Sequence, residues 1–289
     1  MLQTSQTPKK VVNNITPTKI RQMPQILQEI IIDPTNPIET LRRCEGYYYC
    51  PKNKIGERTG PLVECPDTYK TPDGKEKHYV SDIYHNLAKA EQYPYVYTDY
   101  ANKIVEKLAL GKNNIIDMPT VALGMPMDGI NFAHSLALAI KPQCKNIFCE
   151  KKITRMATVE NSEEFIFVLN YHEIYINDKI VIVKNVYDDF HVIDKVVELV
   201  ERLSAQIVAI VCILNISSQK NYEKKLGGKI PIISLIHKPI KKYRQDDPHV
   251  IYDIAKGILV LNPKNNWFKF EETMKSMGGS IKKYVSKNF

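Results

Sequence analysis

The middle of the chain alternates between short apolar runs and longer segments with apolar residues at three- and four-residue spacing. The short runs predict buried strands, and the spaced segments predict amphipathic helices. Strands are expected at 119–123, 145–149, 164–169, 179–183, 206–214 and 231–236, and helices at 129–140 and 194–203. Strand 206–214 is apolar at almost every position, as in a central strand covered on both faces. This alternation indicates an α/β fold with a mainly parallel sheet flanked by helices.

Composition divides the rest of the chain into segments around this core. Residues 1–36 are polar and punctuated by proline, which predicts a flexible arm with a short helical piece near Ile26–Ile31. Residues 40–80 are rich in Tyr, Gly, Pro and Lys, a composition typical of short strands and turns, whereas 81–110 has helical spacing. The expected organisation is an N-terminal arm at 1–36, a hood with a helical lead-in at 37–110, the core at 111–244, and a C-terminal appendage at 245–289 with a helix at 268–277.

The overall composition excludes several classes of protein. The 289 residues are 44% hydrophobic and 25% charged, which is ordinary for a globular protein. No stretch approaches the roughly 20 apolar residues of a membrane span, and the first ten residues lack the apolar run of a secretory signal. Six cysteines make no disulfide framework, so a reducing compartment fits best. We therefore expect a soluble, cytoplasmic protein without membrane contact.

The protein is basic, and its positive charge is local. The net charge is +8, yet residues 1–28, 219–244 and 273–289 together carry +15, so the rest of the chain is acidic. Such stretches could meet a nucleic acid, a phosphate-rich ligand or an acidic partner. They could equally be solvated surface and tails, because no zinc-finger or RNA-recognition signature accompanies them.

In an open parallel sheet, ligands bind beyond the carboxyl ends of the strands, so the segments that follow the apolar runs are the candidate site. Three of them carry a resemblance. They are GMPMDGINFA at 124–133, the basic pair Lys151–Lys152, and DKIVIVKNVYDDFHVID at 178–194. Over roughly residues 80–240 the chain resembles the type I phosphoribosyltransferases, and orotate phosphoribosyltransferase-like proteins in particular.

The resemblance implies a pyrophosphate site and a reaction. In that family the turn after the first core strand receives pyrophosphate, with basic residues against it and a mobile loop over the active site. The corresponding pyrophosphate residues are Met125, Pro126, Met127, Asp128, Gly129, Lys151 and Lys152, and the loop is 153–163. An active member would use Mg²⁺ to transfer ribose 5-phosphate from phosphoribosyl pyrophosphate to a nucleobase such as orotate. The family also implies a place in nucleotide metabolism and a homodimer.

The third segment departs from the family pattern of two adjacent acids followed by Thr, Ser and Gly. The acids bind the ribose hydroxyls, and the small residues form a nest for the 5′-phosphate. The residues of this degenerate ribose-phosphate loop are Lys184, Asn185, Tyr187, Asp188, Asp189 and His191. A shifted register with Asp188–Asp189 as the acid pair still leaves bulky residues from Phe190 onward. We therefore predict that this loop does not bind ribose 5-phosphate in the family's usual way.

Three functions remain open on this basis. The first is a phosphoribosyltransferase-fold pseudoenzyme, with catalysis impaired or lost, that acts as a binding, regulatory or structural component. The second is an active Mg²⁺-dependent transferase, in which Lys151 and Lys152 neutralise the departing pyrophosphate. The third is a nucleic-acid-binding protein that uses its basic stretches. The sequence identifies no catalytic residue, and a phosphorylated small molecule is a possible ligand under the first two functions.

Two further groups in the hood have alternative roles. Cys44, Cys50 and Cys65 could hold a metal with His78 or His85, but their spacing lacks the two close pairs of a zinc site, so free thiols are the default. The run Tyr47–Tyr49 could stack on a nucleobase or pack as core, and core packing is the commoner role for tyrosine in a strand.

Overall fold

The computed structural model describes residues 30–109, 117–126, 128–140, 144–156, 164–188, 190–225 and 227–276. The chain separates into two compact units, residues 1–30 and 31–289, and the described helices and strands all belong to the second unit. The expected N-terminal arm and most of its helical piece near Ile26–Ile31 lie outside the described residues. The four proposed segment boundaries stay a prediction.

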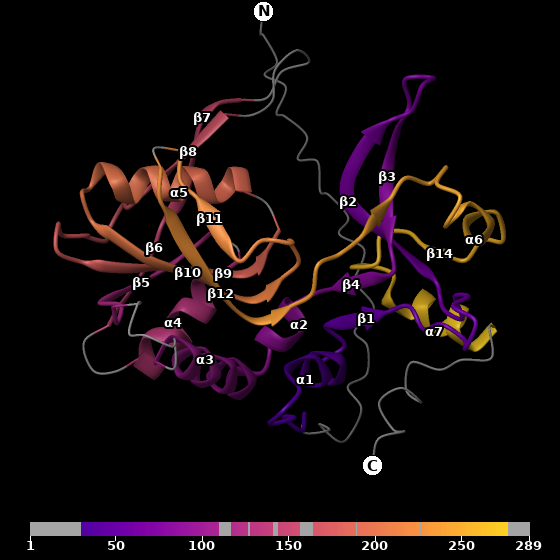
Figure 1. Ribbon diagram of the computed structural model, residues 1–289, viewed down its shortest axis with the longest axis horizontal. Helices are drawn as coiled ribbons and strands as arrows, with labels where there is room; N and C mark the ends of the chain where they lie inside the picture. Colours follow the sequence, from indigo (N-terminus) through magenta and orange to yellow (C-terminus); the bar gives the residue numbers. More distant parts are fainter. Residues whose placement is uncertain are drawn as a thin grey trace, which may run out of the picture. The chain divides into compact units, whose positions relative to one another are not determined.

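Six strands form the main sheet, in the spatial order β11-β12-β10-β9-β5-β6 (Figure 1). Their bounds are Val121–Gly124 (β5), Lys145–Phe148 (β6), Lys179–Tyr187 (β9), Gln206–Asn215 (β10), Asn221–Glu223 (β11) and Lys229–His237 (β12). All neighbours pair in parallel except β11, which is antiparallel to β12 at the edge. The predicted α/β fold with a mainly parallel sheet is therefore confirmed.

The order of the parallel strands creates a specific place for a ligand. Numbered along the chain, the five parallel strands lie in the order 2-1-3-4-5, so the direction of winding reverses between β5 and β9. The crevice at such a switch point, outside the carboxyl ends of the strands, is where doubly wound sheets bind ligands. The loops after β5 and β9 are thus the first places to look for a site.

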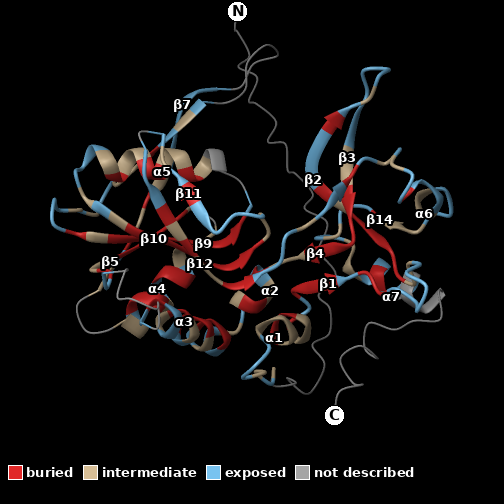
Figure 2. Ribbon diagram, in the orientation of Figure 1, coloured by how far each residue is buried: buried red, intermediate tan, exposed pale blue. Residues whose placement is uncertain are grey.

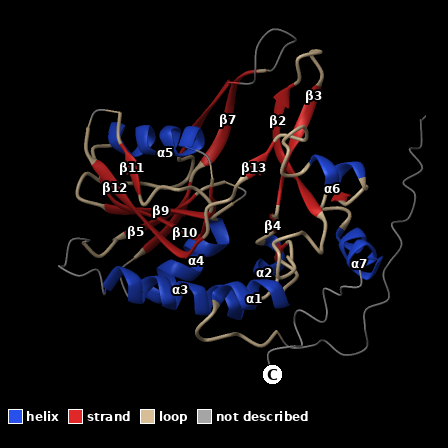
Figure 3. Ribbon diagram, turned by 45° about the vertical axis from the view of Figure 1, so that its right-hand side comes forward, coloured by secondary structure: helices blue, strands red, loops and turns tan. Residues whose placement is uncertain are grey.

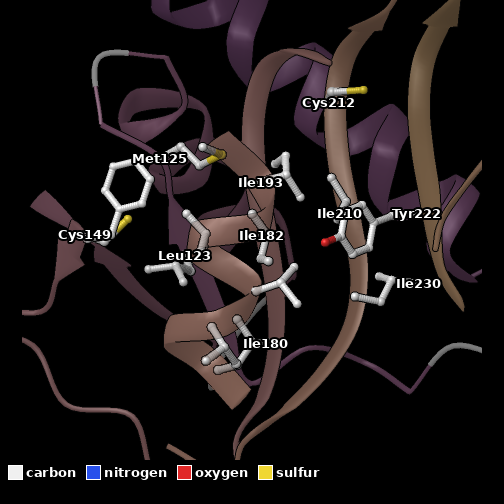
Figure 4. Close-up of a cluster of buried hydrophobic side chains, with 14 of the residues drawn as sticks. Leu123, Met125, Cys149, Ile180, Ile182, Ile193, Ile210, Cys212, Tyr222 and Ile230 are labelled. Carbon is white, nitrogen blue, oxygen red and sulfur yellow. The ribbon is translucent and has the colours of Figure 1, made fainter. Parts of the chain in front are cut away.

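Helices cover both faces of this sheet. Figures 1 and 3 show α5 (Phe190–Arg202) on one face and α3 (Pro94–Ala109) with α4 (Ile130–Ile140) on the other. The buried residues of α5 recur at helical spacing and pack on the sheet in one large apolar cluster (Figure 4). On the opposite face the rings of Tyr97 and Phe132 meet edge to face at 5.6 Å. None of the described helices is both long enough and apolar enough to cross a bilayer.

The hood consists of two small sheets. Strands β1 (Tyr47–Tyr49) and β4 (Ile83–His85) pair antiparallel, and a second sheet has the order β13-β3-β2-β14. The bounds of the remaining hood elements are Pro37–Arg43 (α1), Leu62–Lys70 (β2), Glu76–Ser81 (β3), Ala88–Glu91 (α2), Lys242–Tyr243 (β13), Ile251–Ala255 (α6), Leu259–Val260 (β14) and Trp267–Ser276 (α7). Figure 2 shows that the buried residues extend into these sheets.

Two expectations for the lead-in and the loop are wrong. Residues 83–85 are a strand rather than part of a helix, because they pair with β1 and because the ring of Tyr84 packs against Trp267 and Phe270 at 5.8 and 5.7 Å. Tertiary pairing has here overridden local spacing. The supposed loop at 153–163 begins inside strand β7 (Glu150–Arg155), which pairs with β8 (Glu164–Val168); residues 157–163 lie outside the described part.

The C-terminal appendage is built into the hood. Strand β14 pairs in parallel with β2, and Phe270 of α7 is fully buried against Tyr48 at a ring distance of 4.9 Å. Arg58 adds a charged link, since its guanidinium binds both Asp82 and, at 2.9 Å, Asp253 of α6. The hood is therefore assembled from segments almost 200 residues apart in the chain.

The turn between β5 and α4 requires a glycine. A Cβ at Gly129 would lie 2.2 Å from the carbonyl oxygen of Val183 on β9, far inside van der Waals contact. That oxygen already accepts the backbone N–H of Met125 at 3.0 Å. The close approach fixes the turn against the end of β9.

We predict that Gly129→Ala destabilises the fold by about 3 kcal/mol, because backbone atoms on both sides must move apart. Gly74→Ala is the matched control: it has a positive φ of 78° but no atom within 4 Å of the added methyl, so it should cost about 1 kcal/mol. Urea unfolding of both variants measures the difference. Equal losses would show that the approach to Val183 is not tight.

Candidate functional site

The loops after β5 and β9 are joined at the switch point. Besides the Met125 bond to Val183, the backbone N–H of Asn185 donates to the carbonyl oxygen of Asp128 at 2.8 Å. Met125 is buried, and Pro126 and Asp128 are partly buried. Of the turn predicted to hold pyrophosphate, Met127 alone lies outside the described residues. The turn is thus hydrogen-bonded to the loop that departs from the family pattern.

An ion pair with a buried cation and an exposed anion occupies the end of β9. The ammonium of Lys184 contacts the carboxylate of Asp188 at 2.6 Å. The Lys184 side chain is 9% exposed, whereas that of Asp188 is 38% exposed. Asp189 lies outside the described residues, and His191 falls in the first turn of α5. The strand therefore ends in a salt bridge whose cation is inside and whose anion reaches the surface.

Tyr187 and Asn185, two more residues of the degenerate ribose-phosphate loop, are also buried. Tyr187 is fully buried in the apolar cluster under α5. Asn185 is 4% exposed, and its Oδ1 has no hydrogen-bond partner among the described residues. A buried carbonyl without a donor costs about 1–3 kcal/mol. Among the described residues of this segment, side chains therefore fill the end of the sheet.

The carboxyl of Asp128 lies near the Lys184–Asp188 ion pair. Burial raises the pKa of this carboxyl from 3.8 to about 7; the nearby Lys184 lowers that pKa, and the carboxylates of Asp188 and Glu91 raise it. The backbone N–H of Val186 also favours the ionised form. Near neutral pH the Asp128 carboxyl is therefore partly protonated.

A cavity of about 550 Å³ lies next to the salt bridge, between the hood and the carboxyl edge of the sheet. Its wall takes residues from the hood strands, from the loops after β9, β10 and β12, and from the segment after β14. Those that matter to the chemistry are Glu64, Tyr84, His85, Asp188, Ile216 and Lys242. Of these, Asp188 alone belongs to the predicted site residues.

Most charged groups on the cavity wall are paired within the protein. Lys242 forms an ion pair with Asp67, and Glu64 accepts the backbone N–H of Asn262 at 2.6 Å. Burial lowers the pKa of His85, so its imidazole is neutral near pH 7. The wall thus offers apolar surface and neutral polar groups more than net charge.

The lysines predicted to bind pyrophosphate lie on β7. Both are exposed, and the Lys151 ammonium lies 4.5 Å over the ring of Phe165 on β8. The neighbouring Cys149 donates its backbone N–H to Gly124, so β7 begins near the end of β5. Neither Lys151, Lys152 nor the described turn residues Met125, Pro126, Asp128 and Gly129 line the cavity. The described residues that were predicted to bind pyrophosphate are thus not part of the cavity wall, and their role stays a prediction.

Acids offset much of the charge of the basic stretch 219–244. Ion pairs join Lys224 to Glu201, Lys225 to Glu198, Lys229 to Glu223, Lys242 to Asp67, and Arg244 to Asp246. The two other basic segments fall on residues whose side chains are outside the described part. Five of the eight cations of this stretch are therefore paired with acids within the described part.

The hood cysteines are buried thiols. Burial raises the pKa of Cys44, Cys50 and Cys65 to about 11 each, and the Cys50 thiol donates to the carbonyl of Gly60. Among the described residues no group of three or more His, Cys, Asp and Glu is arranged to hold a metal ion. The middle residue of the run Tyr47–Tyr49 packs in the aromatic cluster with Phe270.

No protein-family model and no curated protein sequence matches the chain. It is similar to solved structures of phosphoribosyltransferases. The orotate enzyme of Aeropyrum pernix has a TM-score of 0.42 at 11% identity, over 69% of this chain and 92% of its own. The adenine enzyme of Leishmania donovani has a TM-score of 0.43 at 14% identity, over 71% and 82%. The likeness concerns the fold alone, and these proteins are of the type that the sequence resembles.

The raised pKa of Asp128 predicts a pH dependence of stability. The folded protein binds a proton at Asp128 up to about pH 7, whereas the unfolded chain releases it near pH 4, so this group's stabilising contribution is lost as pH rises through that window. Relative to wild type, Asp128→Asn should gain on the order of 2 kcal/mol in unfolding free energy between pH 4 and pH 8. Urea unfolding at several pH values measures this, and parallel profiles would contradict it.

Proposed function

We propose that this protein is a phosphoribosyltransferase-fold protein that has lost phosphoribosyl transfer and acts as a binding component through the cavity under its hood. The observation that carries the proposal is the salt bridge between the buried Lys184 and the exposed Asp188 at the end of β9. It stands at the positions where the resembled family has its acid pair and its phosphate nest. In that family, the acid pair binds the ribose hydroxyls through its negative charge, and the nest binds the 5′-phosphate through free backbone N–H groups.

The charges at the end of β9 are opposite to those that phosphoribosyl pyrophosphate needs. A lysine ammonium can only donate, so Lys184 cannot accept the ribose hydroxyls, and Asn185 could accept them only without charge assistance. The Asp188 carboxylate would repel a 5′-phosphate by on the order of 1 kcal/mol at 4–6 Å even when screened. Loss of each charge-assisted hydrogen bond in the nest removes roughly 1.5–3 kcal/mol more.

The side chains of Lys184 and Asp188 do not suit Mg²⁺ as ligands either. Magnesium prefers carboxylate and water oxygens. The ammonium of Lys184 is a buried positive charge that already takes the nearest carboxylate, that of Asp188. The chemistry of an active transferase, in which Mg²⁺ and the two lysines neutralise a departing pyrophosphate, therefore lacks support at this end of the sheet. A binding role needs only the cavity.

The alternatives have weaker support. The ion pairs of the stretch 219–244 satisfy most of its cations within the protein, which favours a solvated surface over a nucleic-acid site. Transfer would need Lys151 and Lys152 at the pyrophosphate, and both lie off the cavity wall. The homodimer implied by the resemblance stays a prediction.

We predict that titration calorimetry detects no binding of phosphoribosyl pyrophosphate with Mg²⁺, and that orotate, adenine and other common bases are not converted. Repulsion at Asp188 and the missing nest are the physical reason. An active orotate phosphoribosyltransferase in the same assay is the positive control. Robust turnover that the double substitution Lys151→Ala, Lys152→Ala abolishes would overturn the proposed function.

A further inference from the structure

The side chain of Lys184, at the carboxyl end of β9, is only 9% exposed. A charged group taken out of water needs an opposite charge, or the cost of burial is several kcal/mol. Among the described residues its ion-pair partner is Asp188, at 2.6 Å. The site for an anion at this point is therefore already built, and a side chain of the protein occupies it.

That side chain is also the part of the pair that a ligand can reach. Asp188 lines the hood cavity, and Lys184 is not among the lining residues. Asp188 is 38% exposed, so water can solvate its carboxylate if the carboxylate leaves the ammonium. Helix α5 begins two residues later, at Phe190, and the start of a helix favours negative charge. The Asp188 carboxylate thus separates a buried cation from an open cavity.

The rest of the wall limits what could replace this carboxylate. Apart from Asp188, the acids Glu64 and Asp67 on the wall are balanced by the cations Lys242 and Lys264, so a second negative charge on a ligand would find no net positive charge there. Most of the remaining lining is apolar, including Ile83, Ile216 and Ile240. A ligand with one negative group and a flat or apolar body meets both conditions.

We propose that Lys184 is an anion-binding group of the hood cavity, that Asp188 plugs it in the free protein, and that the carboxylate of a small monoanionic ligand with an apolar body displaces Asp188 on binding. This rests on the proposed binding function and gives the ligand class of the same site. The exchange replaces one carboxylate by another on the same ammonium, so no covalent bond changes. The displaced Asp188 becomes solvated at the cavity mouth.

The test is calorimetric titration with benzoate, a carboxylate on an apolar ring, at fixed ionic strength. Asp188→Ala should bind benzoate at least about tenfold tighter than wild type, because the internal competitor is gone while the ammonium stays. Adding Lys184→Met to that variant should abolish the gain. Ribose 5-phosphate, a dianion, should gain less than benzoate from Asp188→Ala.

The matched control is Glu64→Gln, which removes one negative charge from the same wall without uncovering a buried ammonium. It should change benzoate affinity less than threefold. An equal gain in Glu64→Gln, or a gain that survives Lys184→Met, would mean a general electrostatic effect and overturn the proposal. No gain in a folded Asp188→Ala overturns it as well. If Asp188→Ala does not fold, Asp188→Asn is compared in the same way.

This experiment separates the two proposals. Absence of a gain in Asp188→Ala refutes the plug but leaves a protein without transfer activity, as the proposed function states. Phosphoribosyl transfer by the wild type refutes the proposed function, whatever the benzoate titrations show.

Discussion

The arrangement of the candidate site depends on one constraint, the need to neutralise a positive charge inside the sheet. Strand β9 is buried from Ile180 to Tyr187, so a lysine within it has no direct path to water. The ammonium of Lys184 is satisfied by a carboxylate four residues later, beyond the end of the strand. This contact holds Asp188 at the cavity wall. The position of the exposed carboxylate thus follows from the burial of the lysine.

A second constraint, steric rather than electrostatic, positions the neighbouring turn. Because Gly129 has no side chain, the turn after β5 can lie against the Val183 carbonyl, and Asn185 can bond to the backbone of Asp128. This close packing brings the Asp128 carboxyl near Lys184 and raises its pKa by burial. Asp128, Asp188 and Lys184 lie together at the end of the sheet, so a change in the charge of one of them changes the electrostatic environment of the other two.

The sheet could be predicted because its determinants are local. Strands β9 and β10 are nearly continuous apolar runs, and α5 has regular apolar spacing, so periodicity located all three. The predicted start of α5 at 194 was too late, because Phe190 and His191 belong to its first turn. The strand at 83–85 was missed because its signal is a partner: β1 and the rings of α7 define it, and neither is near in sequence.

The candidate site could be predicted only in part, for the same reason. Lys184 and Asp188 were identified as misfits to a known pattern, but their ion pair is a matter of three-dimensional packing. Lys242 reaches the cavity through the pairing of β13, at the end of the predicted core segment, with the hood strand β3, and Glu64 lies on β2, the other neighbour of β3. His85 was considered as a metal ligand, whereas the structure makes it a partly buried wall residue whose pKa is lowered by desolvation. No local spacing carries this information.

The pairing of charges on the wall has a consequence for selectivity. A site for a polyanion gains most of its affinity from converging cations and backbone N–H groups. Here Lys242 and Lys184 are each held by a carboxylate, so a polyanion would have to displace two internal partners, and Glu64 offsets the further cation that lines the cavity, Lys264. A monoanion has to displace one. The Lys184–Asp188 pair at the end of β9 therefore favours a small, singly charged ligand over phosphoribosyl pyrophosphate. The fold keeps a ligand cavity at the carboxyl edge of the sheet, but the charges around this cavity favour another class of ligand.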